Sequence, residues 1–465
     1  PSYEARSVNV DAQRTLNCFV EMDDASTRVP VALYGTPGLR KVATLPTGPV
    51  RNSIAEKGFV WVVSGNTVYR VDTSYAVTTV GTINTSSGQV SMASNGSEII
   101  IVDGVNGYII NTTTATVSQI TDADFPNGVK RASYNDGYFL VAGDGSQKFY
   151  ISGLLAGTQW NGLDFASAEG SPDNTLGLIV DHREVWLFGS NSAEVWIDTG
   201  AAAFPFERSG NTFIEHGCVA AASPAKLDNT VFWLGGGETG PGIVWRANGY
   251  TPIRISTHAL EYAINSYGNV SDAYAITYQQ EGHGFYVLTF PTAGKTWAYD
   301  VATQMWHERA YTTPLTGVES QWRGSCHSML GNDHLVGDYQ DGRLYVMDLD
   351  QYTDDGDAIL RLRAAPTMSQ MQNRLFFSEL HVDMETGVGL STGVPVTLML
   401  RYSNDGGHTW SNIKEASLGL PGQYSSRARF HRLGQGRNRT WEVSMTDPVK
   451  FVILGALVDA VAGLN

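Results

Sequence analysis

The stretch Phe59-Val60-Trp61-Val62-Val63-Ser64-Gly65-Asn66-Thr67-Val68-Tyr69-Arg70-Val71 decides the fold class. Two runs of β-branched and aromatic residues flank a Ser-Gly-Asn turn, and this order predicts an antiparallel hairpin. The same arrangement recurs at 99–110, 138–151, 185–197, 231–246, 285–299 and 334–346. A repeat of roughly 40 to 50 residues is typical of the blades of a β-propeller. The sequence therefore predicts an all-β fold with a propeller of seven blades rather than six.

The repeat also sets the expected limits of the propeller, at residues 47–357. Two stacked sandwiches would contain as many strands but give no reason for a fixed period. Before the first hairpin, residues 1–46 contain a strand, a turn at Pro37-Gly38 and a second strand. We expect this N-terminal segment to supply the outer strand of the last blade, because an unclosed ring would leave sheet edges exposed.

The character of the chain changes after Asp354-Asp355-Gly356-Asp357. The first 357 residues contain 20 Lys and Arg against 38 Asp and Glu, whereas residues 358–465 contain 11 against 8, so the formal charges are −18 and +3. Alternating runs such as 395–402 and 440–444 are typical of sandwich strands. We therefore predict a separate, smaller, sandwich-like all-β domain at 358–465, after a solvated acidic linker.

Composition excludes several functional classes. The 465 residues are 42% hydrophobic and 17% charged, with a net charge of −15, which argues against disorder and against a protein that coats DNA or a membrane surface. The three cysteines are widely spaced and favour synthesis in a reducing cytoplasm. No signal peptide is expected at the N-terminus, and the apolar run at 449–464 is too short and too interrupted by charges for membrane insertion.

The strongest short motif is Ser403-Asn404-Asp405-Gly406-Gly407-His408-Thr409-Trp410. It matches the Asp-box pattern of sialidases and related propeller hydrolases. In that pattern the carboxylate accepts hydrogen bonds from turn amides and the tryptophan packs beneath the hairpin. Because a single copy lies outside the repeats, we interpret it as a structural turn formed by Ser403, Asp405, Gly407, Thr409 and Trp410.

The other candidate sites have plain structural explanations. A glycosidase needs paired carboxylates, and no such signature, nucleophile elbow or phosphate loop is present, so no catalytic residue, cofactor or metal is predicted. Cys326, His327 and His334 lack a fourth metal ligand. Asp354, Asp355 and Asp357 lack the spacing of an EF-hand. An arginine series could form a docking face for an acidic partner or a solvated sheet face: Arg427, Arg429, Arg432, Arg437 and Arg439.

Several segments together resemble one family. They are Asn17-Cys18-Phe19-Val20-Glu21, the run 33–39, Gly48-Pro49-Val50-Arg51, the hairpin at 63–71, the turn at 402–407 and the arginine-rich segment before Trp441-Glu442. The chain resembles the tail hub, or nozzle, proteins of short-tailed bacteriophages, called packaged DNA stabilization proteins. The likeness spans most of the chain through turn and strand patterns, and no functional site residue carries over from it.

The resemblance implies a homo-hexamer in the virion tail, assembled in the host cytoplasm. Its implied partners are the head-to-tail adaptor ring, a tailspike or tail fibre, and a tail needle or plug. The hub would seal the portal–adaptor channel, retain packaged DNA and conduct it during ejection. An acidic passage would repel phosphates, so DNA would slide through without specific binding. Two alternatives remain open: a propeller glycan hydrolase of sialidase type, and a propeller module that binds glycans or peptides.

Overall fold

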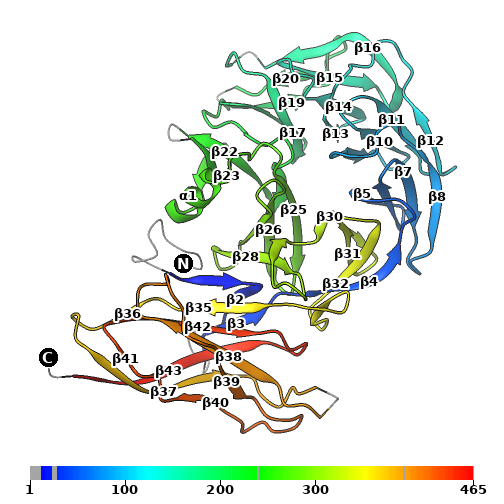
Figure 1. The fold of residues 1–465 in the computed structure, drawn as a ribbon. Helices are drawn as coiled ribbons and strands as arrows, with labels where there is room; N and C mark the ends of the chain where they lie inside the picture. Colours follow the sequence, from blue (N-terminus) through cyan, green and yellow to red (C-terminus); the bar gives the residue numbers. More distant parts are fainter. Residues whose placement is uncertain are drawn as a thin grey trace.

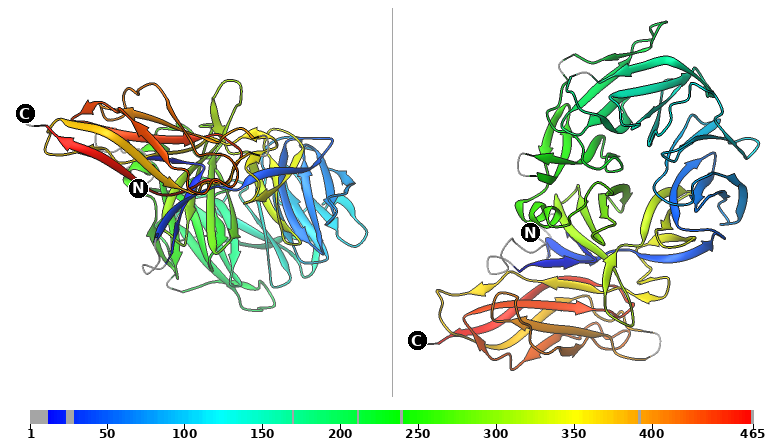
Figure 2. Two further views of the ribbon diagram at one scale, coloured as in Figure 1. Left: turned by 90° about the horizontal axis from the view of Figure 1, so that it is seen from below. Right: turned by 45° about the horizontal axis from the view of Figure 1, so that its top comes forward.

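The fold is a ring of β-sheet units with a second β-domain attached to its side (Figure 1). A computed structural model describes residues 12–23, 29–168, 170–210, 212–237, 240–390 and 393–463. Within these residues the strand pairing gives seven successive antiparallel units of four strands. The second domain lies beside the last two units, next to the described N-terminal strands, as the turned views also show (Figure 2). The predicted fold class, a propeller followed by a smaller sandwich, is confirmed.

The first four units follow one another along the chain, and each is a separate sheet. Their strands are β5 (Val50–Glu56), β6 (Phe59–Ser64), β7 (Thr67–Val71) and β8 (Val77–Thr82); β9 (Ser91–Ser94), β10 (Glu98–Val102), β11 (Gly107–Asn111) and β12 (Thr116–Gln119); β13 (Arg131–Asn135), β14 (Tyr138–Ala142), β15 (Lys148–Gly153) and β16 (Ala156–Ser167); and β17 (Thr175–Asp181), β18 (Glu184–Gly189), β19 (Ala193–Asp198) and β20 (Phe206–Arg208).

The last three units follow, and the seventh takes its outer strand, β4, from the N-terminal part of the chain. Their strands are β21 (Ala225–Leu227), β22 (Thr230–Gly237), β23 (Gly240–Asn248) and β24 (Thr251–Arg254); β25 (Tyr274–Gln280), β26 (His283–Phe290), β27 (Lys295–Asp300) and β28 (Met305–Thr312); and β30 (Gly324–Leu330), β31 (Asp333–Asp338), β32 (Arg343–Asp348) and β4 (Gly38–Thr44). The short helix α1 (His258–Asn265) connects the fifth unit to the sixth, and β29 (Glu319–Gln321) pairs antiparallel with β28.

The seven hairpins recognised in the sequence form the two central strands of the seven units. Their runs are continuously apolar because successive side chains of a strand point to opposite faces and both faces are covered. Thus Val60 and Val62 pack on the last unit, in one core with Leu335 and Val346. Trp61 and Val63, from the same strand, pack on the second unit. A similar apolar core lies between the two units of each further neighbouring pair.

The first and last units are neighbours. Strand β4 pairs antiparallel with β32, with Leu39 opposite Met347 and Gly38 opposite Asp348. A Cβ at Gly38 would lie 2.4 Å from the carbonyl oxygen of Gln351, so only glycine fits at this close approach of two backbones. Ser53 and Ser328, from the two innermost strands, are hydrogen bonded at 2.8 Å. The ring is therefore joined between its first and last units.

The second domain is a sandwich of two sheets, and each sheet combines strands from the N-terminal and the C-terminal parts of the chain. One sheet runs β1 (Arg14–Leu16), β35 (Arg361–Ala364), β42 (Asn438–Met445), β38 (Thr397–Ser403) and β39 (Lys414–Ser417), with β36 (Met368–Ser369) on β42. The other runs β2 (Cys18–Met22), β3 (Val31–Gly35), β43 (Val452–Ala462), β37 (Leu375–Met384) and β40 (Ala428–His431), with β41 (Gln435–Gly436) on β37. The apolar run at 449–464 contains β43.

Strands β1 to β3 connect the two domains, whereas β4 closes the ring. β1 pairs in parallel with β28 of the sixth unit and antiparallel with β35, so one sheet continues from the ring into the sandwich. The side chain of Arg14 reinforces this joint through ion pairs with Glu308 at 2.8 Å and Glu319 at 2.5 Å. The sandwich thus contains N-terminal strands that the sequence analysis assigned to a separate segment.

The acidic segment at 354–357 is not a solvated linker, and this interpretation was wrong. β33 (Thr353–Asp354) and β34 (Asp357–Ala358) form a small hairpin, and Asp354 pairs in parallel with Leu39 of β4. Asp354 is 5% exposed and its Oδ1 atom has no hydrogen-bond partner. Burial raises the pKa of this carboxyl to about 7, against the opposing effect of Arg361. Backbone pairing with the closing strand buries a side chain that composition alone places in solvent.

Candidate functional site

A cavity of about 980 Å³ lies along the axis of the ring. Each unit contributes residues from its innermost strand or from the segment just before it: Asn52, Val90, Arg131, Leu176, Ala225, Ile276 and His327. Turns between the central strands of several units, such as Gly104 and Gly143, also line it. A cavity of this size is suited to a small ligand or to a segment of a partner.

The charged groups of the cavity differ in how their hydrogen-bonding capacity is used. Arg51 donates to the backbone carbonyl oxygens of Gly65, Thr85, Ser87 and Gly88 at 2.7 to 3.1 Å, so it holds two segments of the chain together. Asp103 accepts two amide hydrogens of its own turn and the hydroxyl of Thr85. Both side chains therefore have structural roles.

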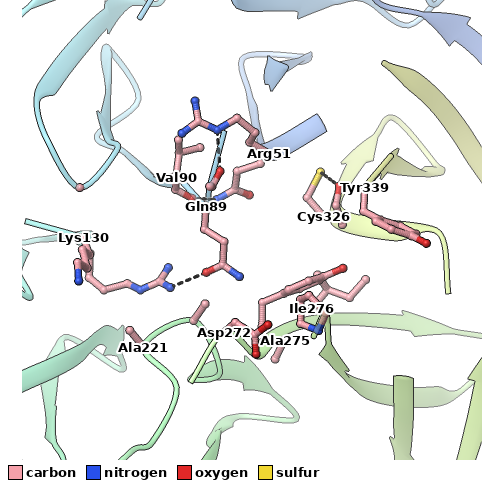
Figure 3. Close-up of a pocket in the computed structure, with 18 of the residues that line it drawn as sticks. Arg51, Gln89, Val90, Lys130, Ala221, Asp272, Ala275, Ile276, Cys326 and Tyr339 are labelled. Carbon is pink, nitrogen blue, oxygen red and sulfur yellow. Dashed lines mark hydrogen bonds between the residues drawn. The ribbon is translucent and has the colours of Figure 1, made fainter. Parts of the chain in front are cut away.

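Arg131 is different, because its donors are only partly used. Its Nη2 atom donates to Oε1 of Gln89 at 3.1 Å, drawn as a dashed line in Figure 3, while its buried Nε atom has no hydrogen-bond partner. Burial lowers the pKa of Arg131 to about 10, which leaves it charged at neutral pH. The neighbouring Lys130 is exposed and also lines the cavity. The sequence analysis did not single out these residues; two adjacent basic residues in the acidic part of the chain, residues 1–357, were the available signal.

The Asp-box turn closes on itself. The Oδ1 atom of Asp405 accepts hydrogen bonds from the Ser403 hydroxyl at 2.6 Å and the Thr409 amide at 2.9 Å, and Oδ2 accepts from the Thr409 hydroxyl at 2.6 Å. The Gly407 amide donates to the hydroxyl oxygen of Ser403 at 2.8 Å. These bonds hold the pKa of Asp405 well below its ordinary value. Trp410 lies under the guanidinium of Arg401, 4.8 Å from ring centre to Cζ. The turn's own donors therefore occupy both oxygens of the carboxylate.

The arginine series is not one surface. Arg427, Arg429, Arg432 and Arg437 are exposed, and Arg429 forms an ion pair with Glu379 at 3.4 Å. Arg439 is 1% exposed and lies within about 4 to 5 Å of the rings of Phe377, Tyr402 and Trp441. Arg439 therefore belongs to the sandwich core and not to the docking face in which the sequence analysis included it.

No metal centre emerges from the part of the chain that the structure describes. His327 and His334 do meet, with Nε2 and Nδ1 3.0 Å apart, but no group of three or more potential ligands is found among these residues. Burial lowers the pKa of His327 to about 4, so the pair is neutral at physiological pH. Cys326 is buried as a free thiol. Among the described residues, no helix is long and apolar enough to cross a membrane.

Comparison with solved structures gives several matches at low identity. A chain of the mitotic checkpoint complex is 13% identical, with 70% of this chain and 95% of that chain covered and a TM-score of 0.46. The WD40 β-propeller domain of Doa1 is 12% identical, with 67% and 97% covered and a TM-score of 0.42. The WD40 domain of Neurospora crassa Pan2 is 11% identical, with 70% and 97% covered and a TM-score of 0.44. Likenesses this distant carry no argument about function, and no curated protein matches the chain.

Comparison with protein families is decisive, because both domains match parts of the same protein. Residues 14–352 match the family described as "Bacteriophage P22 Gp10, beta-propeller". Residues 361–461 match the family described as "Bacteriophage P22 Gp10, beta-sandwich". The first match alone covers more than half of the chain, and its limits include the strands β1 to β4 that join the ring to the sandwich. The chain therefore belongs to the family of bacteriophage P22 Gp10, the tail hub or packaged DNA stabilization proteins of short-tailed phages.

Proposed function

We propose that this protein seals the portal–adaptor channel of a short-tailed phage, retains the packaged genome and conducts it during ejection. Family membership makes the chain a structural component of the phage tail and so of the virion. That the matches run through both domains is the observation that carries the proposal. The family is one of structural proteins, in agreement with a non-enzymatic role.

The proposed assembly is a homo-hexamer that contacts the head-to-tail adaptor ring, a tailspike or tail fibre, and a needle or plug. The charge split supports such contacts, because residues 358–465, with a formal charge of +3, can dock on neighbouring surfaces formed by residues 1–357, with a formal charge of −18. The exposed arginines 427, 429, 432 and 437 are the proposed docking face. Contacts of this kind weaken as salt is raised, whereas the apolar cores between the units do not.

The duplex would pass through the assembly without specific binding. An acidic protein repels phosphates and gains nothing from counterion release, so the free subunit should not retain duplex DNA. The glycan hydrolase alternative is not favoured, since both oxygens of the Asp-box carboxylate accept hydrogen bonds from its own turn, and this turn lies outside the ring.

Two measurements test the proposal. Native mass measurement of the purified chain bound to its adaptor ring should give six copies per assembly; five or twelve would overturn the six-fold arrangement. A gel shift at physiological salt should show no stable complex between the free subunit and duplex DNA. Tight binding with a steep dependence on salt would overturn the idea of a passage that does not hold DNA.

A further inference from the structure

Folding alone does not account for Arg131. Its Nε–H group is buried without an acceptor, and among the described residues the guanidinium forms no ion pair. A buried, charged hydrogen-bond donor without an acceptor lowers the free energy of unfolding, and an apolar side chain of similar size would avoid that cost. A residue that weakens the fold and points into a cavity is a candidate for ligand binding.

The cavity is lined by three basic and two acidic side chains, whereas residues 1–357 are acidic as a whole. Arg51, Lys130 and Arg131 line it, against Asp103 and Asp272. Arg51 and Asp103 are held by their own loops, as described above. Lys130 and Arg131 are adjacent in the chain, and neither forms an ion pair with any described residue. Two cations that lack anionic partners and line the same cavity are suited to binding an oxyanion.

Asp272 supplies a complementary group on the other side of the cavity. Its Oδ2 atom accepts hydrogen bonds from the amide and hydroxyl of Thr292 at 2.9 and 2.6 Å. Its Oδ1 atom is buried and has no hydrogen-bond donor. Gln89 and Asp272 come from different units and project into the same open space (Figure 3). The cavity is therefore lined by a guanidinium that forms no ion pair with a described residue and by a carboxylate with one oxygen that receives no hydrogen bond.

We propose that the axial cavity binds a small organic oxyanion that also carries a hydroxyl or ammonium group. Arg131, with Gln89 and Lys130, receives the carboxylate or phosphate of the ligand. The carboxylate of Asp272 accepts a hydrogen bond from the ligand's donor group. The site is independent of hexamer formation, because all of its residues lie within one subunit.

Calorimetric titration of the full-length chain with four probes tests the site and its chemistry. Citrate and tricarballylate differ by one hydroxyl group, and glycerol 3-phosphate and inorganic phosphate differ by a hydroxylated arm. We expect saturable binding of citrate or glycerol 3-phosphate, about 5-fold tighter than their partners without a hydroxyl. The pair of probes that binds with the higher affinity shows whether the ligand carries a carboxylate or a phosphate. No saturable binding of any probe up to ~10 mM would overturn the proposal.

Three variants show whether the named residues bind the probe. Arg131→Met should lower the affinity at least about 10-fold. Asp272→Asn should remove the preference for the hydroxylated probe. The matched control is Arg183→Met, because Arg183 is exposed, pairs with Asp136 at 2.8 Å and lies outside the cavity; its affinity should equal that of the unmodified chain. Equal losses in Arg131→Met and Arg183→Met, or none in either, would contradict the assignment.

Discussion

The sandwich core and the axial cavity each contain an arginine whose pKa burial lowers to about 10, and the two are used in opposite ways. Arg439 donates to Oδ1 of Asn404 at 2.9 Å and to the carbonyl oxygens of Leu433 and Gln435 at 2.6 and 3.0 Å, and three aromatic rings surround it. Arg131 makes one bond to a glutamine and leaves a buried donor unused.

The difference shows that burial and charge together do not identify a binding residue. What separates the two arginines is whether the chain itself supplies the acceptors. A guanidinium with its acceptors in place stabilises the fold around it, whereas one without them weakens the fold and is available to a ligand. Substitutions of these and two further polar groups should therefore differ in size and in sign.

The largest expected effect is at Arg439. Arg439→Met leaves two backbone carbonyls and the Asn404 side chain without their donor and removes the cation from the three rings. We expect the free energy of unfolding of the sandwich to fall by about 3 kcal/mol. Urea denaturation followed by circular dichroism and tryptophan fluorescence measures it. Arg439→Lys keeps the charge but not the planar fork, and should recover less than half of the loss. An unchanged midpoint for Arg439→Met would contradict a structural role.

A smaller effect with a marked pH dependence is expected at Asp354. Its folded-state pKa of about 7 lies above the ordinary value of 3.8, so the folded state holds a proton that the unfolded chain releases. The stability linked to this group is therefore present below pH ~4 and is lost as the pH rises to 7. Asp354→Asn mimics the protonated form and should raise the melting temperature by about 3 °C at pH 8 and leave it unchanged near pH 4. A fall at pH 8 would mean that pairing with Arg361 outweighs burial.

Much of the propeller was predictable because its pattern is local. Central strands such as 59–63 and 67–71 are covered on both faces, so each appears as an apolar run next to a turn, and the repeat of such runs indicates the ring. Arg439 and Asp354 were misplaced because their burial depends on distant partners. Asp354 is buried by pairing with Leu39, more than 300 residues away in the chain, and no local pattern shows that contact. The Asp-box turn needs only neighbouring residues, and its bonding pattern is visible in the motif itself.

The Asp-box carboxylate should have a modest effect, since it is exposed. Asp405→Ala removes the acceptor of the Thr409 amide and hydroxyl, and we expect the melting temperature to fall by about 2 °C. Because the pKa of Asp405 is lowered, its contribution is present above pH ~4 and lost as the pH falls further, so the variant and the unmodified chain should converge in acid. Differential scanning calorimetry at pH 7 and pH 3 measures this, with Glu207→Ala on β20, also exposed, as the control. A larger loss at pH 3 than at pH 7 would contradict the bonding described for this turn.

The smallest effect on stability is expected at Arg131, and its sign is what matters. Arg131→Met loses one hydrogen bond to Gln89, worth about 1 kcal/mol, and no longer buries an unfilled guanidinium donor, which recovers a similar or larger amount. The melting temperature in ligand-free buffer should thus stay within about 1 °C of the unmodified chain or rise. Scanning calorimetry of Arg131→Met beside Arg439→Met gives the comparison directly, because the same substitution removes a buried arginine in each region. If both variants were destabilised alike, Arg131 would be a second structural arginine, and the distinction between filled and unfilled donors would fail. If Arg131→Met were as stable as the unmodified chain and no longer gained stability from citrate, the unused donor would be explained by the ligand that the fold leaves room for.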